Sequence, residues 1–215
     1  GQRAGPERIF RSRLLKSFAR WATRKILFFG ARRPQPPPPS GRKNRRKDST
    51  LMSQEMRIEK DSLGEVRIPA AAYWGTTTQR ALEVYSISGL KHPAKFIEAF
   101  LMLKKAAALA NRESGALSPE IAGAILRAAD EILAGALRDQ FVVDVFQMGA
   151  GTSFHMNVNE VLANRANELL GGRIGANSPV TANNHVNFGQ STNDAFPTNS
   201  SGTRSCCYAG NARRC

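Results

Sequence analysis

Two short polar segments hold residue types suited to binding a small anion. Residues 189–194 read Gly-Gln-Ser-Thr-Asn-Asp, and residues 149–153 read Gly-Ala-Gly-Thr-Ser. Hydroxyls, carboxamides and the backbone N–H groups beside glycine all donate hydrogen bonds to anions. Neither segment has the lysine and spacing of a nucleotide-binding P-loop. The sequence therefore predicts that both segments serve a site for a small anion.

Three long helices are expected to position these segments. Residues 94–113, about 118–135 and about 153–170 each carry apolar side chains at helical spacing. Ser118 suits the N-cap of the second helix, and Pro119 suits its first position. The third helix opens at the end of the glycine-rich segment, so this segment should lie at a helix amino end.

A small β-hairpin is expected before the helices. Residues 57–61 and 66–69 have strand character and flank a turn that contains Gly64. The polar run 76–80 is expected as a loop that leads into a short helix. The predicted fold class is therefore mainly α with one small β-hairpin, and the sequence shows no internal repeat.

The formal net charge of +14 is concentrated in the first 51 residues. These carry 15 Lys+Arg and 2 Asp+Glu, whereas the rest of the chain carries 16 and 15. The remainder is close to neutral, so we expect no nucleic-acid partner for it. No apolar run reaches the roughly 18 residues of a membrane-spanning helix, so no membrane partner is expected either.

Two interpretations of the Pro/Arg-rich arm, residues 1–51, stay open. The arm is either upstream sequence outside the natural protein, which would then start at Met52 or Met56, or a presequence. The presequence interpretation rests on residues 8–29, where Phe10, Leu14 and Phe18 share a face opposite arginines. In either case we expect the arm to lack a fold, and residues 52–198 to form the domain.

The last segment, residues 199–215, has no apolar period and is rich in Cys, Gly, Ser and Arg. We expect it to be a disordered tail from a different reading of the gene. All three cysteines lie in this segment, so the domain should contain neither a disulfide framework nor a cysteine metal site.

Five motifs in one order resemble the amino-terminal domain of the aspartase/class II fumarase family. Each motif alone is a weak signal, but five in register over about 140 residues are specific. The resemblance covers about residues 57–198 and leaves out both ends. The motifs are residues 57–64, 73–80, 149–153, 156–164 and 190–194.

The resemblance implies the helical amino-terminal domain of this fold, with the central helical bundle of the family missing here. It implies reversible elimination across C2–C3 of a small dicarboxylate (aspartate and fumarate, or malate), without cofactor or metal, in a homotetramer. In the family the base is a serine on a mobile loop that this sequence does not contain. No catalytic residue is therefore assigned, and the chain is expected to be inactive alone.

The resemblance also implies the substrate-binding residues. Thr152, Ser153, Ser191 and Thr192 would bind the carboxylates, and Asn193 the leaving-group end or the other carboxylate. Helix capping is the competing role, because threonine or serine at the start of the third helix suits an N-cap anyway. For one segment alone capping is the better explanation, whereas both segments in register favour substrate binding.

Within the family the residues favour aspartate ammonia-lyase over fumarate hydratase. Residues 149–153 and 191–194 look like the aspartase versions, whereas Tyr73-Trp74-Gly75 looks fumarase-like. A truncated or frameshifted lyase of this kind is the first hypothesis, and a non-catalytic helical assembly domain is the alternative of another class. We expect a cytoplasmic location, or a mitochondrial one if the arm is a presequence.

Other polar residues are expected to be structural. His155 stands where the family usually has asparagine, and it is not the family's base; His92 should be solvated; His185 should serve as a hydrogen-bonding residue. Glu160 and Asn164 lie four residues apart on one helix face, so they should brace packing.

Overall fold

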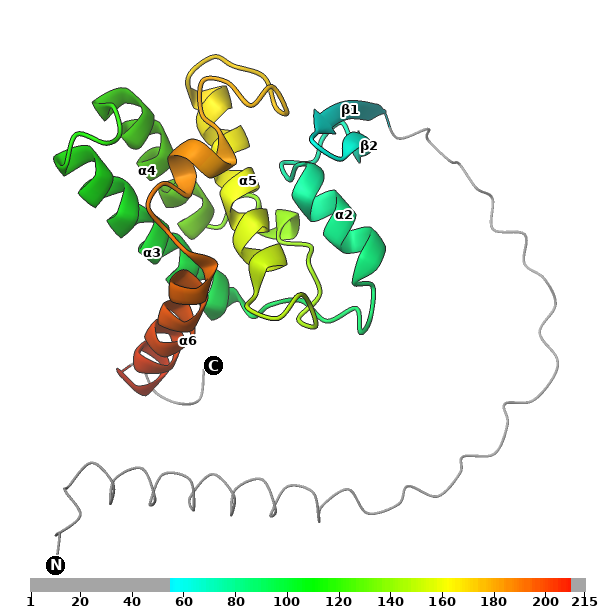
Figure 1. Cartoon of the computed structure of the whole chain (residues 1–215). Helices are drawn as coiled ribbons and strands as arrows, with labels where there is room; N and C mark the ends of the chain where they lie inside the picture. The colour runs from blue at the N-terminus through cyan, green and yellow to red at the C-terminus, as the bar shows by residue number, and fades with distance from the viewer. Residues whose placement is uncertain (1–54, 210–215) are drawn as a thin grey trace, which may run out of the picture. The chain divides into compact units, whose positions relative to one another are not determined.

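The computed structural model describes residues 55–209, so the arm predicted for residues 1–51 lies outside the described part of the chain. The fold is mainly helical with one two-stranded antiparallel sheet (Figure 1), as expected. In chain order its elements are β1 (Met56–Asp61), β2 (Gly64–Pro69), α2 (Thr76–Val84), α3 (Ala94–Glu113), α4 (Pro119–Leu133), η1 (Arg138–Gln140), α5 (Thr152–Leu169), η2 (Ala182–Val186) and α6 (Thr192–Ala209).

The predicted hairpin is confirmed. Strands β1 and β2 pair with Asp61 opposite Gly64, which leaves a two-residue turn. Gly64 has φ 116°, a left-handed value that glycine adopts without strain. The inward residues Val66 and Ile68 are buried beside Ala72, and together they form a small apolar cluster under the hairpin.

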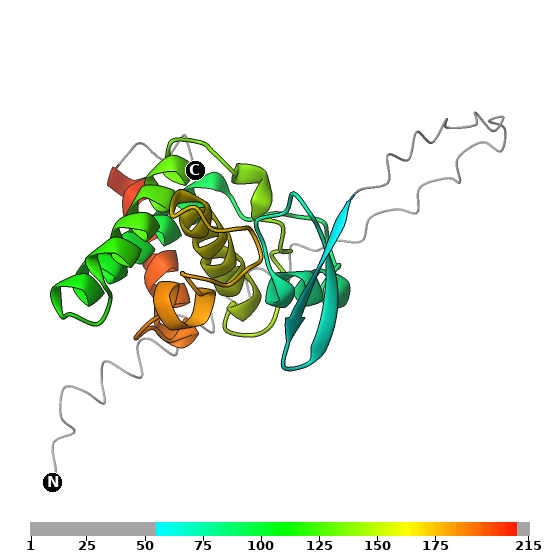
Figure 2. The same ribbon diagram turned by 90° about the horizontal axis from the view of Figure 1, so that it is seen from above.

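Helix α5 is the central element of the helical body. Thirteen of its 18 residues are buried, so the helix is covered on most of its circumference. It packs against α4 on one side and against α2 on the other (Figures 1 and 2). The main core joins α3, α4 and α5, and its largest fully buried apolar side chains include Phe100, Leu101, Ile125 and Phe154.

The ends of the long helices follow the predicted signals. Helix α3 begins and ends at the predicted residues, Ala94 and Glu113. Helix α4 begins at Pro119, and the Ser118 hydroxyl accepts a hydrogen bond from the Ile121 N–H at 3.3 Å. Helix α5 ends with the Gly172 N–H bonded to the Asn167 carbonyl, which closes its last turn.

The polar run 76–80 was wrongly predicted as a loop. Helix α2 already begins at Thr76. The local sequence supplies no capping side chain, but the Glu160 carboxylate of α5 accepts hydrogen bonds from the N–H groups of Gly75, Thr77 and Thr78. This cap comes from 82 to 85 residues away, beyond the range of a local pattern.

Residues 199–209 were expected to be disordered, whereas in the structure α6 continues to Ala209. Its first turns are anchored by packing: Asn199 is 2% exposed, and its Nδ2 donates to the Phe96 carbonyl of α3 at 3.3 Å. Ser200 and Thr203 bond back to the carbonyls four residues earlier, so their hydroxyls are satisfied inside the helix. Once a turn is fixed by packing, each further residue extends the helix at little cost.

Among residues 55–209, none of the helices combines the length and the apolar character that crossing a bilayer requires.

Candidate functional site

The glycine-rich segment forms the amino end of α5. Gly151 is the residue before the helix and has φ 82°, and its N–H donates to the Met148 carbonyl at 2.8 Å. Gly151 has no side chain to cap the helix, and the Gln147 Oε1 accepts from the Phe154 N–H in the first turn at 2.7 Å. Thr152 and Ser153 therefore do not take the capping role considered for them. Their hydroxyls make no hydrogen bond to another described residue, so they can take an external ligand.

Thr152 and Ser153 line a cleft of about 640 Å³. Its walls come from the hairpin, helix α2, the amino half of α5 and residues 177–184. The carboxylates in these walls are already engaged. Asp61 pairs with Arg80 at 2.9 Å, and Glu59 pairs with Arg57 at 2.7 Å.

The second polar segment forms the amino end of α6, outside the lining of this cleft. Ser191 caps the helix weakly, because its Oγ accepts from the Asn193 N–H at 3.3 Å. Ser191 and Asn193 are exposed, and Thr192 is half-buried. The structure thus gives Ser191 a capping role, and leaves the side chains of Thr192 and Asn193 near solvent.

Two contacts bring the amino ends of α5 and α6 together. The His155 Nδ1 lies 2.8 Å from the Thr192 Oγ1. A Cβ added to Gly151 would lie 2.2 Å from the Phe196 ring, so the backbone here approaches the ring as closely as glycine allows. The two predicted segments are therefore neighbours, although only one of them faces the cleft.

A buried polar cluster lies behind this junction and was not predicted. Lys104 of α3 is 1% exposed. Its Nζ lies 2.6 Å from the His155 Nε2, 2.7 Å from the Gln190 Oε1 and 3.4 Å from the Asn187 Oδ1. Burial lowers the pKa of Lys104 to about 7. The sequence signal was its position on the apolar stripe of α3, four residues after Phe100.

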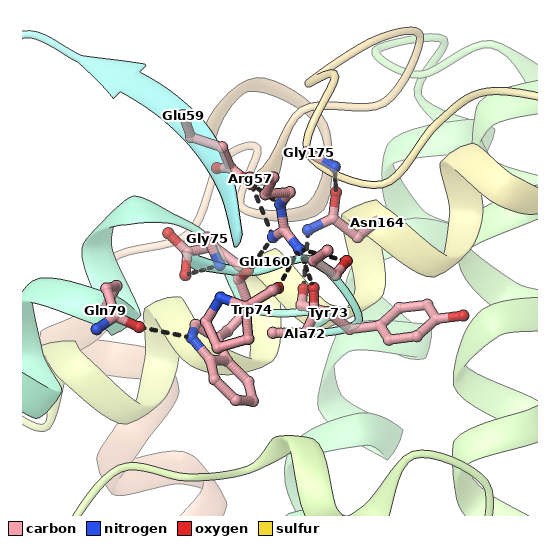
Figure 3. A network of polar contacts seen from close by, with 12 residues as sticks. Arg57, Glu59, Ala72, Tyr73, Trp74, Gly75, Gln79, Glu160, Asn164 and Gly175 are labelled. Carbon is pink, nitrogen blue, oxygen red and sulfur yellow. Dashed lines mark hydrogen bonds and ion pairs between the residues drawn. The ribbon is translucent and has the colours of Figure 1, made fainter. Parts of the chain in front are cut away.

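A second polar network ties the hairpin to α5 (Figure 3). The Arg57 guanidinium donates to the carbonyls of Pro69, Ala70, Ala72 and Trp74 at 2.6 to 3.1 Å. It thereby holds the segment that leads from β2 to α2. Burial raises the pKa of Glu59, and the bond from Arg57 opposes this shift.

Glu160 and Asn164 brace this network, as predicted. Glu160 binds the amino end of α2, and the Asn164 Nδ2 donates to the Tyr73 carbonyl at 2.8 Å. The Asn164 Oδ1 accepts from the Gly175 N–H at 2.8 Å, so one side chain connects three segments (Figure 3). Both residues hold the cleft walls rather than offer groups to a ligand.

The histidines differ in how well they were predicted. His185 is a structural residue, because its Nδ1 accepts from the Thr181 N–H at 2.9 Å. His92 was wrongly expected to be solvated. Its ring stacks on Phe96 at 4.9 Å and contacts Phe154 at 4.1 Å, and burial lowers its pKa to about 4. Aromatic neighbours from α3 and α5 cover part of this ring, and His92 is half-buried.

Acid is expected to destabilise the folded chain through two of these rings. Burial lowers the pKa of His155 to about 3, with a contribution from Lys104, and that of His92 to about 4. From the ordinary value of 6.5 downward, the unfolded chain takes up a proton at each ring before the folded chain does. Stability therefore falls as the pH is lowered from 6.5 towards 3.

Thermal unfolding followed by circular dichroism across this pH range measures the effect. The variant His155→Asn should show a shallower dependence, because one of the two rings is gone. Lys104 adds no slope in this window, since it is protonated in both states below about pH 7. Equal slopes for the variant and the parent chain would contradict the assignment.

Three or more His, Cys, Asp or Glu side chains do not gather as a metal-ligand set anywhere in the described part of the chain.

Comparison with known proteins places the chain among lyases. Residues 64–201 match the model of a family described as lyase. Class II fumarate hydratase from Halobacterium salinarum is 56% identical over 147 residues, which are 68% of this chain and 31% of that protein. Aspartate ammonia-lyase from a Bacillus species is 52% identical over 147 residues, which again are 68% of this chain and 31% of that protein.

Solved structures give the same result. The fumarate lyase:delta crystallin from Brucella melitensis in native form matches with a TM-score of 0.69 and 46% identity, over 71% of this chain and 35% of that one. The recombinant class II fumarase from Schistosoma mansoni matches with a TM-score of 0.70 and 35% identity. The match covers 73% of this chain and 33% of that one. The chain spans about a third of the length of the curated relatives it matches.

Proposed function

Since this chain belongs to the fumarase/aspartase family of lyases, we propose that residues 55–209 bind a four-carbon dicarboxylate for elimination across C2–C3. The observation that carries the proposal is the pair of adjacent helix amino ends, each bearing hydroxyl residues. The amino end of a helix attracts anions through its unpaired N–H groups and its dipole. Two such ends side by side suit a molecule with two carboxylates.

The chemistry explains why hydroxyls and amides are suitable donors. A base removes a proton from C3, which becomes acidic only as the neighbouring carboxylate takes up charge in an aci-carboxylate. Donors aimed at that carboxylate stabilise the transition state more than the ground state. Neutral donors also allow the dianionic product to leave, which a buried cation would oppose.

We assign the residues as follows. Thr152 and Ser153 bind one carboxylate from the cleft, and Ser191 and Thr192 bind the other. Asn193 contacts the leaving-group end or the second carboxylate. The cap that Ser191 provides through Oγ leaves its hydroxyl hydrogen available to a ligand.

The described residues supply binding rather than the base. Glu59, Asp61 and Glu160 line the cleft, but each is held by a guanidinium or by backbone N–H groups. None of these carboxylates is free to take the C3 proton. We therefore propose that the base comes from outside these residues, and that the chain alone binds substrate without turning it over.

For the leaving group we favour ammonia, with L-aspartate as substrate. The Gly-Ala-Gly-Thr-Ser and Ser-Thr-Asn-Asp sequences support this choice. Water, with malate as substrate, is the second candidate. It is supported by the higher identity to the Halobacterium fumarate hydratase, 56% against 52% for the Bacillus aspartate ammonia-lyase.

We also propose that the chain associates with further copies, as in the homotetramer that the resemblance implies. Large apolar side chains are exposed on the hairpin and α2: Leu63 is 77% exposed, Val84 68% and Ile58 62%. Contiguous apolar surface marks protein–protein contact sites, and we propose these side chains as part of such a site. Sedimentation of the full chain tests the association.

Binding to the full chain tests the dicarboxylate assignment. We expect fumarate and L-aspartate to saturate the chain in calorimetric titrations, and Thr152→Val to weaken binding about 10–100-fold. This is the range for loss of one hydrogen bond to a charged group. Thr203→Val is the control, because the Thr203 hydroxyl bonds within α6.

Equal affinities of the parent chain and Thr152→Val for fumarate would refute the role of this hydroxyl. Absence of saturation by any four-carbon dicarboxylate would refute the binding proposal itself. An ultraviolet assay of fumarate formation from L-aspartate or malate tests the expectation of no turnover, and a rate above that of the buffer would contradict it.

A further inference from the structure

We infer that Lys104 and His155 are positioning residues that fix the Thr192 hydroxyl as a hydrogen-bond donor to the bound anion. The inference rests on the proposed function, because it names how one of the assigned donors is oriented. It concerns a chain of three side chains from three different helices, α3, α5 and α6. The nearest atoms along this chain are 2.6 Å and 2.8 Å apart.

The direction of the first bond follows from the acceptors around Lys104. An ammonium group has three hydrogens and no acceptor. Gln190 donates its Nε2 to the Val186 carbonyl at 2.9 Å, which turns its Oε1 towards Lys104. The Asn187 Oδ1 takes a second, longer bond. The third ammonium hydrogen is then directed at the His155 Nε2, which must accept it.

Burial lowers the pKa of Lys104, but an aromatic ring and three acceptor atoms surround its Nζ. The Nζ lies 5.8 Å from the centroid of the Phe100 ring, within the range of a cation–π contact. Three acceptor atoms lie 2.6 to 3.4 Å from it, one for each hydrogen of an ammonium group. Below its pKa of about 7 the group carries the three hydrogens that the geometry requires.

The tautomer of His155 then decides what Thr192 can do. A neutral ring whose Nε2 accepts must carry its hydrogen on Nδ1. This N–H donates to the Thr192 Oγ1 at 2.8 Å, so the hydroxyl hydrogen points elsewhere and is free for a ligand. In the opposite tautomer Thr192 would donate to Nδ1 and would have no hydrogen left for an anion.

The position of Thr192 makes this orientation useful. Thr192 is the first residue of α6 and is half-buried, so its hydroxyl lies between the buried cluster and the surface. No other hydrogen bond to its Oγ1 occurs among residues 55–209. A fixed donor at a helix amino end needs little reorganisation when an anion binds, which is the condition for strong electrostatic stabilisation.

The tautomer can be measured without any ligand. Long-range proton–nitrogen NMR of the 15N-labelled full chain reports which ring nitrogen is protonated. The spectra are recorded between pH 3 and pH 7, because this pH range lies between the pKa of His155 and that of Lys104. The His155 signals are assigned from their loss in His155→Asn. We expect a protonated Nδ1 and an unprotonated Nε2. A protonated Nε2 overturns the inference.

Binding of fumarate tests the consequence for Thr192. Lys104→Met should weaken binding at least about tenfold, the effect of one charge-assisted hydrogen bond. His155→Asn should bind within about threefold of the parent chain, because an amide can accept from Lys104 and donate to Thr192 in the same way. Lys105→Met is the matched control, since the Lys105 side chain is 30% exposed and pairs with Asp130 on the helix surface.

The outcomes separate the two proposals. Lys104→Met binding as tightly as Lys105→Met overturns the positioning role, even if the parent chain binds fumarate. A parent chain that shows the expected tautomer but binds none of fumarate, L-aspartate and malate overturns the proposed function, and the donor role of Thr192 with it. The expected tautomer together with selective loss in Lys104→Met supports both.

Discussion

Replacing Gly151 with alanine is expected to lower the free energy of unfolding by about 2–5 kcal/mol. Part of this loss is backbone strain, because φ of 82° costs an L-residue about 1–2 kcal/mol. The rest is steric, because the new methyl group would lie 2.2 Å from the Phe196 ring, and overpacking typically costs about 1–3 kcal/mol. Urea unfolding at fixed pH, followed by circular dichroism, measures the change.

Gly149→Ala is the matched control, two residues earlier in the same segment. A Cβ at Gly149 meets nothing within 4 Å, so its effect should stay within about 0.5 kcal/mol. Measured against Phe196→Ala alone, the double variant Gly151→Ala/Phe196→Ala should lose only the backbone part, because the ring that the methyl group would meet is gone. The prediction fails if the two single glycine variants unfold at the same urea concentration.

Replacing Glu160 with alanine is expected to cost about 3–5 kcal/mol. Glu160 is 6% exposed, and its carboxylate accepts hydrogen bonds from three backbone N–H groups at 2.8 to 3.1 Å. Its removal leaves two buried donors and one half-buried donor without a partner. A buried unpaired donor costs about 1–3 kcal/mol, and water can reach the half-buried one. Helix α2 loses its cap and the hairpin loses its attachment to α5. Urea unfolding again provides the measurement.

Glu113→Ala is a control of the same chemistry. Glu113 is exposed and lies at the carboxyl end of α3, so its loss should change the free energy of unfolding by no more than about 0.5 kcal/mol. Glu160→Gln retains one acceptor oxygen and should fall between the two. A loss in Glu160→Ala no larger than in Glu113→Ala would show that the cap contributes nothing.

The elements that sequence predicted well are those whose signals are local. Helix α3 follows a proline and carries a continuous apolar stripe, and α4 has a serine cap followed by a proline. Helix α2 was misread because its cap comes from Glu160, and the carboxyl half of α6 because Asn199 packs against α3. In both cases a distant contact supplies what the local sequence lacks.

The same distinction applies to the candidate site. The resemblance predicts Thr152 and Thr192 as binding residues, and in the structure a contact through His155 joins the two helix ends on which they lie. Lys104 was missed because a lysine in an alanine-rich helix usually lies at the surface. Its burial depends on acceptors from Gln190 and Asn187, more than 80 residues later in the chain.

The attachment of α2 to α5 also sets an order of assembly. Gly75 and Glu160 are 85 residues apart in the chain, so joining them closes a long loop. Helices α3, α4 and α5 follow one another and pack as neighbours, which requires only short closures. The helical core should therefore form first, and the hairpin with α2 should dock onto it last and detach from it first. The cleft, which needs both parts, would then exist only in the fully assembled domain, so local opening would remove the site without unfolding the core.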